Sequence, residues 1–315
     1  MQNKSMKTGS YTIPFDRKQD KVAIIAPSSA CKDAAGNFDL EMSKTRLSIA
    51  ISLFEERGFS CKYDEKIFAG GNLEYFAASK EERLRQLREA IEDPCIKIIS
   101  VFRGGYGAGE IVFDCLKIKP SCRKIFIGYS DATVLHYLFN QHYGFPSIHG
   151  TISENHKDMM KDIVSVLGGK SAEFTLQAWN QRAQSSSNIS AQVTGGNLTL
   201  ICNMIGTKLH PSLANKILFV EDVNERGYQV HRHLLHMKNA GLFERVKAVI
   251  FADFTESDKL LDASIEHFIS NYLYSVPVFR TSGIGHGKIN YPLALGATGH
   301  INNLIFSVES PFKLV

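Results

Sequence analysis

The sequence changes pattern most sharply in the stretch Lys124-Ile125-Phe126-Ile127-Gly128-Tyr129-Ser130-Asp131-Ala132-Thr133-Val134-Leu135-His136. Its first part is apolar, as in a buried strand, and apolar residues then recur at helical spacing. Ser130 falls on the turn between them. A tight strand-to-helix turn of this kind is typical of a nucleophile elbow, and the helix N-terminus favours the negative charge of an acyl-transfer oxyanion. Ser130 is therefore a candidate nucleophile, and the alternative is a simple N-cap, a position that serine also favours.

The first half of the chain alternates strands and helices around this stretch. Apolar runs predict strands at 22–27, 61–63 and 96–102 besides the one before Ser130, and the intervening patterns predict helices at 42–57, 79–91 and 109–116. Ser79 and Glu82 form a capping-box pattern at the start of the second helix. The alternation predicts an α/β fold with a mostly parallel sheet covered on both faces. Gly104 and Ser130 both follow strands, at the sheet edge where such folds place their sites.

The second half begins after a polar segment. Residues 177–190 predict an exposed loop or linker. Beyond it, apolar runs predict strands at 216–220, 246–251 and 304–308, with helices near 231–240 and 263–272. We therefore expect an N-terminal tail at 1–20, an α/β domain at 21–168, a linker at 169–192 and a second α/β domain at 193–315.

The composition is that of an ordinary globular protein. The 315 residues are 44% hydrophobic and 22% charged, with a formal net charge of +4. The small, dispersed charge argues against nucleic acid as a partner. The polar first 20 residues predict no signal peptide, and no apolar stretch approaches the roughly 20 residues that span a bilayer. Six scattered cysteines without a CxxC pair predict reduced thiols and a cytoplasmic location.

A glycine-rich loop directly follows the third predicted strand. The run Arg103-Gly104-Gly105-Tyr106-Gly107-Ala108-Gly109 departs from the G-x-G-x-x-G spacing of dinucleotide-binding loops. Glycines let main-chain N–H groups approach a ligand closely. We interpret the run as a backbone donor loop facing Ser130, with a purely structural turn as the alternative.

An acid and a histidine in the second half are candidate partners for a nucleophile. Glu221 ends an apolar strand, where a buried carboxylate needs a partner, although it also fits a turn cap. His286 lies in Gly283-Ile284-Gly285-His286-Gly287, and histidine suits general-base work near neutrality. It fits a surface loop equally well. Three further histidines lack a zinc-site pattern and are interpreted as part of a helix that carries histidines, so we predict no metal: His231, His233 and His236.

Taken together, these segments resemble the serine LD-carboxypeptidases over about residues 21–310. The resemblance is carried, in order along the chain, by Ala26-Pro27-Ser28-Ser29, Arg103-Gly104-Gly105-Tyr106-Gly107, Gly128-Tyr129-Ser130-Asp131, Gly195-Gly196-Asn197-Leu198, Phe219-Val220-Glu221-Asp222 and Gly285-His286. It implies a flavodoxin-like N-terminal domain with the nucleophile Ser130, and a smaller swivelling β/α domain with Glu221 and His286. It also implies an oxyanion hole of the Gly105 and Asp131 N–H groups, no cofactor, and a homodimer.

The same resemblance implies the substrate. A cytoplasmic murein tetrapeptide would lose its terminal D-alanine by cleavage of an LD peptide bond, as in peptidoglycan recycling. An arginine suits recognition of the free carboxylate, so Arg103 and Arg232 are candidate substrate contacts, together with Tyr106. One alternative is a self-immunity peptidase that cleaves a toxic peptide–nucleotide conjugate of the microcin C type. A non-catalytic protein that binds an anion or peptide between two domains is the alternative from another class.

Overall fold

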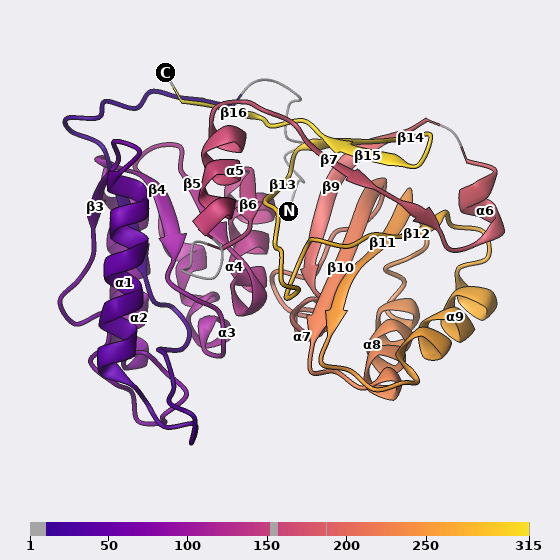
Figure 1. Ribbon diagram of the computed structural model, residues 1–315, viewed down its shortest axis with the longest axis horizontal. Helices are drawn as coiled ribbons and strands as arrows, with labels where there is room; N and C mark the ends of the chain where they lie inside the picture. Colours follow the sequence, from indigo (N-terminus) through magenta and orange to yellow (C-terminus); the bar gives the residue numbers. More distant parts are fainter. Residues whose placement is uncertain (1–10, 152–156, 187, 315) are drawn as a thin grey trace.

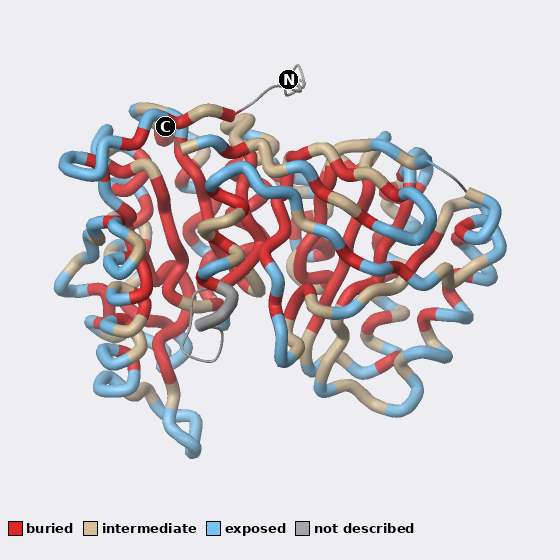
Figure 2. The backbone as a smooth tube through the Cα atoms, turned by 45° about the horizontal axis from the view of Figure 1, so that its top comes forward, coloured by how far each residue is buried: buried red, intermediate tan, exposed pale blue. Residues whose placement is uncertain are grey.

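Two sheets, each flanked by helices, form two lobes that lie side by side (Figure 1). The computed structural model describes residues 11–151, 157–186 and 188–314. Residues 1–10 of the expected N-terminal tail lie outside the described residues. The strands run through the middle of both lobes as buried segments, and exposed residues gather on the outer helices and loops (Figure 2). The α/β fold class and the two-domain arrangement are confirmed.

The first lobe contains the predicted parallel sheet. Its parallel strands are β2 (Lys21–Ile25), β3 (Ser60–Lys62), β4 (Ile96–Val101), β5 (Ile125–Gly128) and β6 (Ser147–His149). They lie in the order β3-β2-β4-β5-β6, which is the strand order of flavodoxin-like doubly wound sheets. A sixth strand, β13 (Leu293–Leu295), pairs antiparallel with β6. The sheet is thus completed by a segment from the far end of the sequence.

The first four helices of the first lobe follow the predicted order, and the fifth was not predicted. The helices are α1 (Leu40–Glu55), α2 (Lys80–Glu92), α3 (Ala108–Ile111), α4 (Thr133–Tyr137) and α5 (Lys157–Leu167). Ser79 caps α2 and its hydroxyl accepts the Glu82 N–H at 3.3 Å, as predicted. The helix predicted at 109–116 is divided into α3 and a 3₁₀ turn, η1 (Asp114–Lys117). The helix after Ser130 starts as a 3₁₀ turn, η2 (Ser130–Ala132), and ends as a π-helix, η3 (Leu138–Tyr143).

The second sheet curls until its two edges approach each other. Its strand order is β7 (Ala172–Thr175), β15 (Ile305–Val308), β14 (Thr298–Asn302), β9 (Ile189–Asn197), β10 (Lys216–Val223), β11 (Ala248–Thr255), β12 (Val278–Arg280) and β8 (Gln177–Ala178). Strands β9 to β12 are parallel and the outer pairings are antiparallel. The edge strands β7 and β8 are neighbours in sequence, so one short segment nearly closes the sheet. The helices of this lobe are α6 (Gln181–Gln184), α7 (Leu198–Asn203), α8 (Gly227–Asn239) and α9 (Leu261–Tyr272).

Segment 169–192, expected as a linker, contains β7, β8, α6 and the start of β9. Its polar composition suits edge strands, which expose one side to water, as well as it suits a loop. Residues 11–13 of the expected tail form β1 (Tyr11–Ile13), which pairs in parallel with β16 (Phe312–Leu314). The domain boundaries and the swivelling class of the second domain stay predictions.

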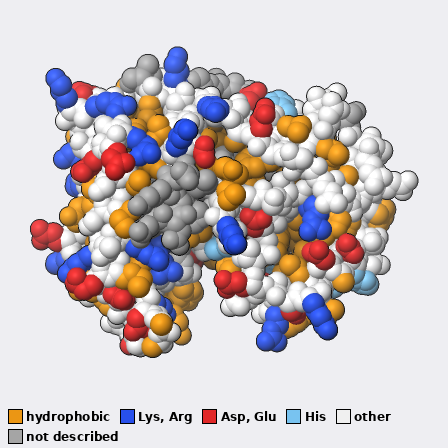
Figure 3. Space-filling view, viewed as in Figure 1, with side chains coloured by type: hydrophobic (Ala, Val, Ile, Leu, Met, Phe, Trp, Pro, Cys, Tyr) orange, Lys and Arg blue, Asp and Glu red, His pale blue; other side chains and the backbone are white. Residues whose placement is uncertain are grey.

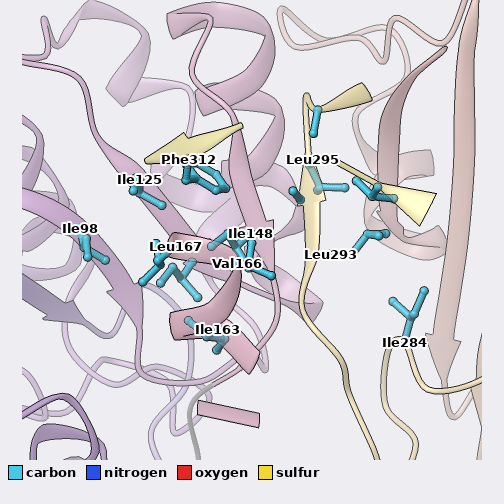
Figure 4. Close-up of a cluster of buried hydrophobic side chains, with 14 of the residues drawn as sticks. Ile98, Ile125, Ile148, Ile163, Val166, Leu167, Ile284, Leu293, Leu295 and Phe312 are labelled. Atoms are coloured by element: carbon cyan, nitrogen blue, oxygen red, sulfur yellow. The ribbon is translucent and has the colours of Figure 1, made fainter. Parts of the chain in front are cut away.

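The two lobes share one apolar core. Ile148 of β6 belongs to the same buried cluster as Ile284, Leu293 and Leu295 from the C-terminal part of the chain. Figure 4 shows Leu293 and Leu295 on the strand that enters between the lobes, with Ile148 on the first-lobe side. Burial of apolar surface in this shared cluster therefore opposes separation of the lobes. No helix among the described residues is long and apolar enough to cross a membrane.

We expect Leu293→Ala to lower the free energy of unfolding by about 2–5 kcal/mol, because Leu293 is fully buried where β13 joins the first sheet. The matched control is Ile289→Ala in the preceding loop, where the side chain is 44% exposed and the change is about 0.5 kcal/mol or less. Denaturant unfolding of both variants measures the difference. Equal effects would show that β13 contributes no more to the fold than the loop before it.

Candidate active site

Ser130 occupies a strained turn at the end of β5. Its φ is 59°, in the left-handed region that costs a non-glycine residue about 1–3 kcal/mol and is concentrated at functional sites. Tyr129 holds the cap position of η2, and its side chain makes no capping hydrogen bond. Among the hydrogen bonds between described residues, none uses the Ser130 hydroxyl. The turn therefore has the geometry of a nucleophile elbow, and Ser130 is not held as a helix cap.

The glycine-rich loop lies directly against this elbow. A β-carbon on Gly104 would stand 2.6 Å from Ser130 Cβ and 2.8 Å from its Oγ. At Gly105 the φ is +115°, and a β-carbon there would meet Ser29 Oγ at 2.3 Å. Both positions thus require glycine, for space at Gly104 and for space and conformation at Gly105. The loop and the elbow face each other as the sequence predicts.

The Asp131 carboxylate joins the elbow to the neighbouring loops. It is buried, and its Oδ2 accepts the Ser28 hydroxyl at 2.6 Å and the Ala108 N–H at 2.8 Å. Burial raises the pKa of Asp131 despite these hydrogen bonds. The residue predicted to contribute only its backbone N–H therefore also fixes, through its side chain, the elbow relative to both loops.

Arg83 of α2 supports the same loops from behind. Its side chain is fully buried, and Nη1 donates to Pro27 O at 3.0 Å and to Gly107 O at 2.7 Å. The guanidinium also pairs with Glu110 and stacks over the Phe76 ring at 4.2 Å. The planar fork of an arginine holds five N–H donors in fixed directions, so it can satisfy several carbonyls and a carboxylate at once. The backbone of the glycine-rich loop is therefore rigidly supported.

Glu221 and His286 form a short hydrogen-bonded pair. His286 Nδ1 lies 2.6 Å from Glu221 Oε2, and the Glu221 side chain is fully buried. Between Val220 and Asp222 the register of β10 against β11 shifts, so Glu221 lies at a β-bulge, a feature that re-aims side chains beside active sites. Gly285 has φ +120°, and a β-carbon there would lie 2.8 Å from Glu221 Oε2. Only glycine before His286 lets its loop approach the acid so closely.

Electrostatics fix the charge of this pair. Complete burial by itself raises the pKa of Glu221, but its hydrogen bond to His286 and its charge interactions with His149 and His286 outweigh burial and lower the pKa to about 2. Burial lowers the pKa of His286, and its hydrogen bond and attraction to Glu221 reverse this, so the pKa of His286 lies above its ordinary value of 6.5. Glu221 is therefore a permanent anion near neutral pH, and His286 is a strengthened base.

Tyr129 brings the base and the elbow together. Its ring lies against the His286 imidazole, with centroids 5.2 Å apart, and Ser130 is the next residue. The arrows of β4 and β10 run toward the same edge in Figure 1, and the surface is notched between the lobes along that edge (Figure 3). The elbow of one lobe and the acid–base pair of the other thus meet where the two sets of strands end.

The predicted substrate contacts lie at different places. Arg103 Nη1 donates to Ala30 O at 2.6 Å, and its charge acts on Tyr129. Tyr106 is 56% exposed and stacks on Phe76 with centroids 5.6 Å apart. Arg232 is exposed on α8 and stacks over Tyr228 at 5.3 Å. Arg103 and Tyr106 thus belong to the loop beside Ser130, whereas no contact between described residues joins Arg232 to the elbow.

Sequence reasoning missed several residues that hold the site together. They are His149, Asp253 and Arg83. His149 of β6 has its Nε2 3.7 Å from Glu221 Oε1. Asp253 Oδ2 accepts the Gly283 N–H at 3.0 Å and so fixes the loop of His286. His149 and Asp253 stand in segments with no recognisable motif, and Arg83 follows the capping box of α2 without being part of it. Only their long-range contacts identify these three residues.

A metal centre has no support in the described part of the chain, where no group of three or more His, Cys, Asp and Glu side chains is arranged to hold an ion. Of the three histidines on α8, His233 lies 3.3 Å from Thr199 Oγ1 and 3.9 Å from Glu225.

Comparison with known proteins agrees with this two-lobed arrangement. Residues 22–150 match the LD-carboxypeptidase N-terminal domain, and residues 190–301 match the LD-carboxypeptidase C-terminal domain. A Rickettsia conorii protein, provisionally named a carboxypeptidase, is 40% identical over 82% of this chain and 83% of its own. The crystal structure of a muramoyltetrapeptide carboxypeptidase from Oxalobacter formigenes is 27% identical, with a TM-score of 0.74, over 92% of this chain and 98% of that one. The microcin C7 self-immunity protein shares the fold, with a TM-score of 0.77 at 19% identity over 96% of this chain and 99% of that one.

Fold and site together define a two-domain α/β protein with a serine elbow in one domain and an acid–histidine pair in the other. The chain belongs to the LD-carboxypeptidase family, peptidase family S66. The resemblance drawn from the sequence motifs is thereby confirmed.

Gly104→Ala tests the close contact between the loop and the elbow. Gly104 has no left-handed backbone, so alanine is tolerated by the chain itself, and the added methyl group displaces Ser130 instead. Misplacement of a reacting group by about 1 Å can slow its reaction roughly a hundredfold, and we expect a loss of this order in the covalent labelling of Ser130 by a serine-directed fluorophosphonate. The control is Gly109→Ala, where no atom lies within 4 Å of the added carbon. Equal labelling rates in the two variants would show that Gly104 does not set the position of Ser130.

Proposed function

We propose that this protein is a serine carboxypeptidase that hydrolyses an LD peptide bond and releases the terminal D-alanine of murein tetrapeptides in the cytoplasm. Ser130 is the nucleophile, His286 the general base and acid, and Glu221 the residue that orients His286. The observation that carries the proposal is the 2.6 Å Glu221–His286 pair, whose imidazole contacts the ring of Tyr129, the residue directly before a serine with φ 59°. All six cysteines are free, as expected for a reducing compartment.

Acylation follows from these positions. His286 accepts the Ser130 proton at Nε2 while Oγ attacks the carbonyl carbon of the bond before D-alanine. Glu221 accepts the Nδ1–H of the imidazolium and stabilises its charge. The carbonyl oxygen becomes an oxyanion that accepts hydrogen bonds from the Gly105 and Asp131 N–H groups, each worth about 3–4 kcal/mol in comparable sites. The C–N bond then breaks as His286 protonates the nitrogen of the departing D-alanine.

Deacylation repeats the same chemical steps with water as the nucleophile. His286, neutral again, removes a proton from a water molecule that attacks the acyl carbon, and a second oxyanion forms in the same place. Its collapse breaks the bond to Oγ, and His286 returns the proton to Ser130. The products are a tripeptide with a free carboxylate and D-alanine, and no cofactor takes part in either half.

An exopeptidase must also recognise the substrate's terminal carboxylate. Arg103 is the favoured residue for this role because its loop carries the proposed oxyanion donor Gly105. Its positive charge also reaches Tyr129, since it opposes the rise in the Tyr129 pKa that burial causes. The exposed Tyr106 ring on the same loop is suited to contact the peptide. Arg232, on α8, is the less favoured reader of the carboxylate. A homodimer, which the resemblance implies, remains part of the proposal.

Ser130→Ala tests the reaction on L-Ala-D-Glu-meso-diaminopimelate-D-Ala, with free D-alanine as the readout. Loss of a triad serine costs on the order of 10⁶ in turnover in a well-studied serine protease, so we expect release only by the wild type. Equal release by both proteins would exclude Ser130 as the nucleophile. Hydrolysis by wild type of a peptide–nucleotide conjugate instead of the tetrapeptide would favour the self-immunity activity. Tight peptide binding without turnover, unchanged in Ser130→Ala, would favour a binding protein.

The raised pKa of His286 predicts the pH profile. Because only neutral His286 accepts a proton, kcat/KM should rise through an apparent pKa above 6.5. Glu221→Gln removes the anion that raises this pKa, so the acidic limb should move to lower pH while the maximal rate falls. The matched control is Glu309→Gln, which breaks an exposed Glu–His pair with His300, 3.0 Å apart. A limb that stays in place in Glu221→Gln would contradict the assigned roles.

A further inference from the structure

His149 connects the backbone of the elbow with the segment that follows the base loop. In the first sheet it is the Cα partner of Gly128 on β5, two residues before Ser130. On its other side it is the Cα partner of Leu293 on β13, seven residues after His286. One residue of β6 thus lies in register with the segments that carry the nucleophile and the base.

The His149 side chain faces the acid across the lobe interface. It is fully buried, and its Nε2 lies 3.7 Å from Glu221 Oε1, the carboxylate oxygen that His286 does not use. Phe219 of β10 packs against the imidazole, with ring centroids 5.1 Å apart. Glu221 therefore has an imidazole on each side, one from its own lobe and one from the lobe of the nucleophile.

The polar atoms with which His149 and Glu221 face each other make no hydrogen bonds in the described structure. Both ring nitrogens of His149 and Oε1 of Glu221 are buried without a hydrogen bond. Each such group costs about 1–3 kcal/mol when left unpaired. The 3.7 Å separation of Nε2 and Oε1 exceeds the length of a good hydrogen bond, about 2.9 Å, by less than an ångström. A closure of less than an ångström between the lobes makes a direct hydrogen bond.

We propose that His149 is a positioning residue for Glu221, donating its Nε2–H to Oε1 while Oε2 holds His286. The proposal rests on the proposed function, since it assigns Glu221 the orienting role there. Two donors on opposite oxygens fix the plane of the carboxylate and hence the direction of the His286 ring. Because His149 belongs to the first lobe, the orientation of His286 depends on how the two lobes are packed against each other.

This arrangement has a defined electrostatic consequence. A donor at Oε1 draws negative charge away from Oε2, so its removal strengthens the attraction of Glu221 for His286 and raises the pKa of His286. Other titratable groups lie around His286 and His149 and are the background against which the change in the His286 pKa is measured. They are Asp222, Asp253 and Glu256 around His286, and Tyr129 and His136 around His149.

The test measures the His286 pKa by NMR titration of the imidazole, together with kcat and KM for tetrapeptide hydrolysis. We expect His149→Leu, which fills the space without a donor, to raise the pKa and to lower kcat roughly tenfold with KM little changed. His149→Gln keeps an N–H donor and should restore most of both values. In the Glu221→Gln background, His149→Leu should no longer move the pKa, because the anion that couples the two histidines is absent.

The control for general damage to the core is His136→Gln. His136 is an equally buried histidine of the first lobe whose nitrogens bond Ser147 Oγ and Gly128 O rather than Glu221. It should lower stability without moving the pKa of His286. An unchanged or lowered His286 pKa in His149→Leu would overturn the proposal. The NMR readout needs no substrate, so absence of tetrapeptide hydrolysis by wild type would refute the proposed function while the role of His149 is still decided.

Discussion

The pairing of β13 with β6 is the constraint on which the site depends. It adds a C-terminal strand to the edge of the N-terminal sheet and places Leu293 and Leu295 in a core shared with Ile148. Ser130 and His286 are 156 residues apart in sequence; Ser130 lies on the turn that follows β5, and His286 lies on a loop. Because β13 pairs with β6 shortly after His286, it holds the His286 loop close to the sheet that carries Ser130. Catalytic geometry of this kind is most precise when rigid elements hold it, as both sheets do here.

A buried carboxylate gives the site its chemical character. Glu221 is fully buried at a β-bulge, and removal from water would leave it protonated unless donors stabilised its charge. The neighbouring histidines supply that stabilisation and hold its pKa near 2. In return, the ionised Glu221 raises the pKa of His286. The strain at Ser130, the close packing of Gly104 and the buried side chains of Asp131 and Arg83 fix the other half of the site.

Local sequence patterns predicted the first lobe well. Its strands and helices follow apolar periodicity, the cap at Ser79 is where the pattern placed it, and the elbow lies where the pattern changes at Ser130. Glu221 and His286 were identified as candidates from strand-end and glycine signals, and the structure pairs them. The nearly closed second sheet was missed because its edges, β7 and β8, are short and polar.

Residues whose importance arises only from tertiary contacts were also beyond sequence reasoning. Arg83 appears as an ordinary charged residue of an amphipathic helix, yet it is buried and supports the glycine-rich loop. His149 ends a three-residue strand with no distinctive pattern, and β13 has no signal that it joins the first sheet. A periodicity describes which face of an element is buried, but it does not state which distant element will cover that face.

A crystal structure of Ser130→Ala with the murein tetrapeptide bound tests the central claim most directly. The account predicts that the peptide lies where the two lobes meet, with the scissile carbonyl oxygen within hydrogen-bond distance of the Gly105 and Asp131 N–H groups. It further predicts that His286 Nε2 faces the position of the missing hydroxyl. A peptide bound elsewhere, or a carbonyl directed away from both N–H groups, would contradict the claim that this junction is the catalytic centre.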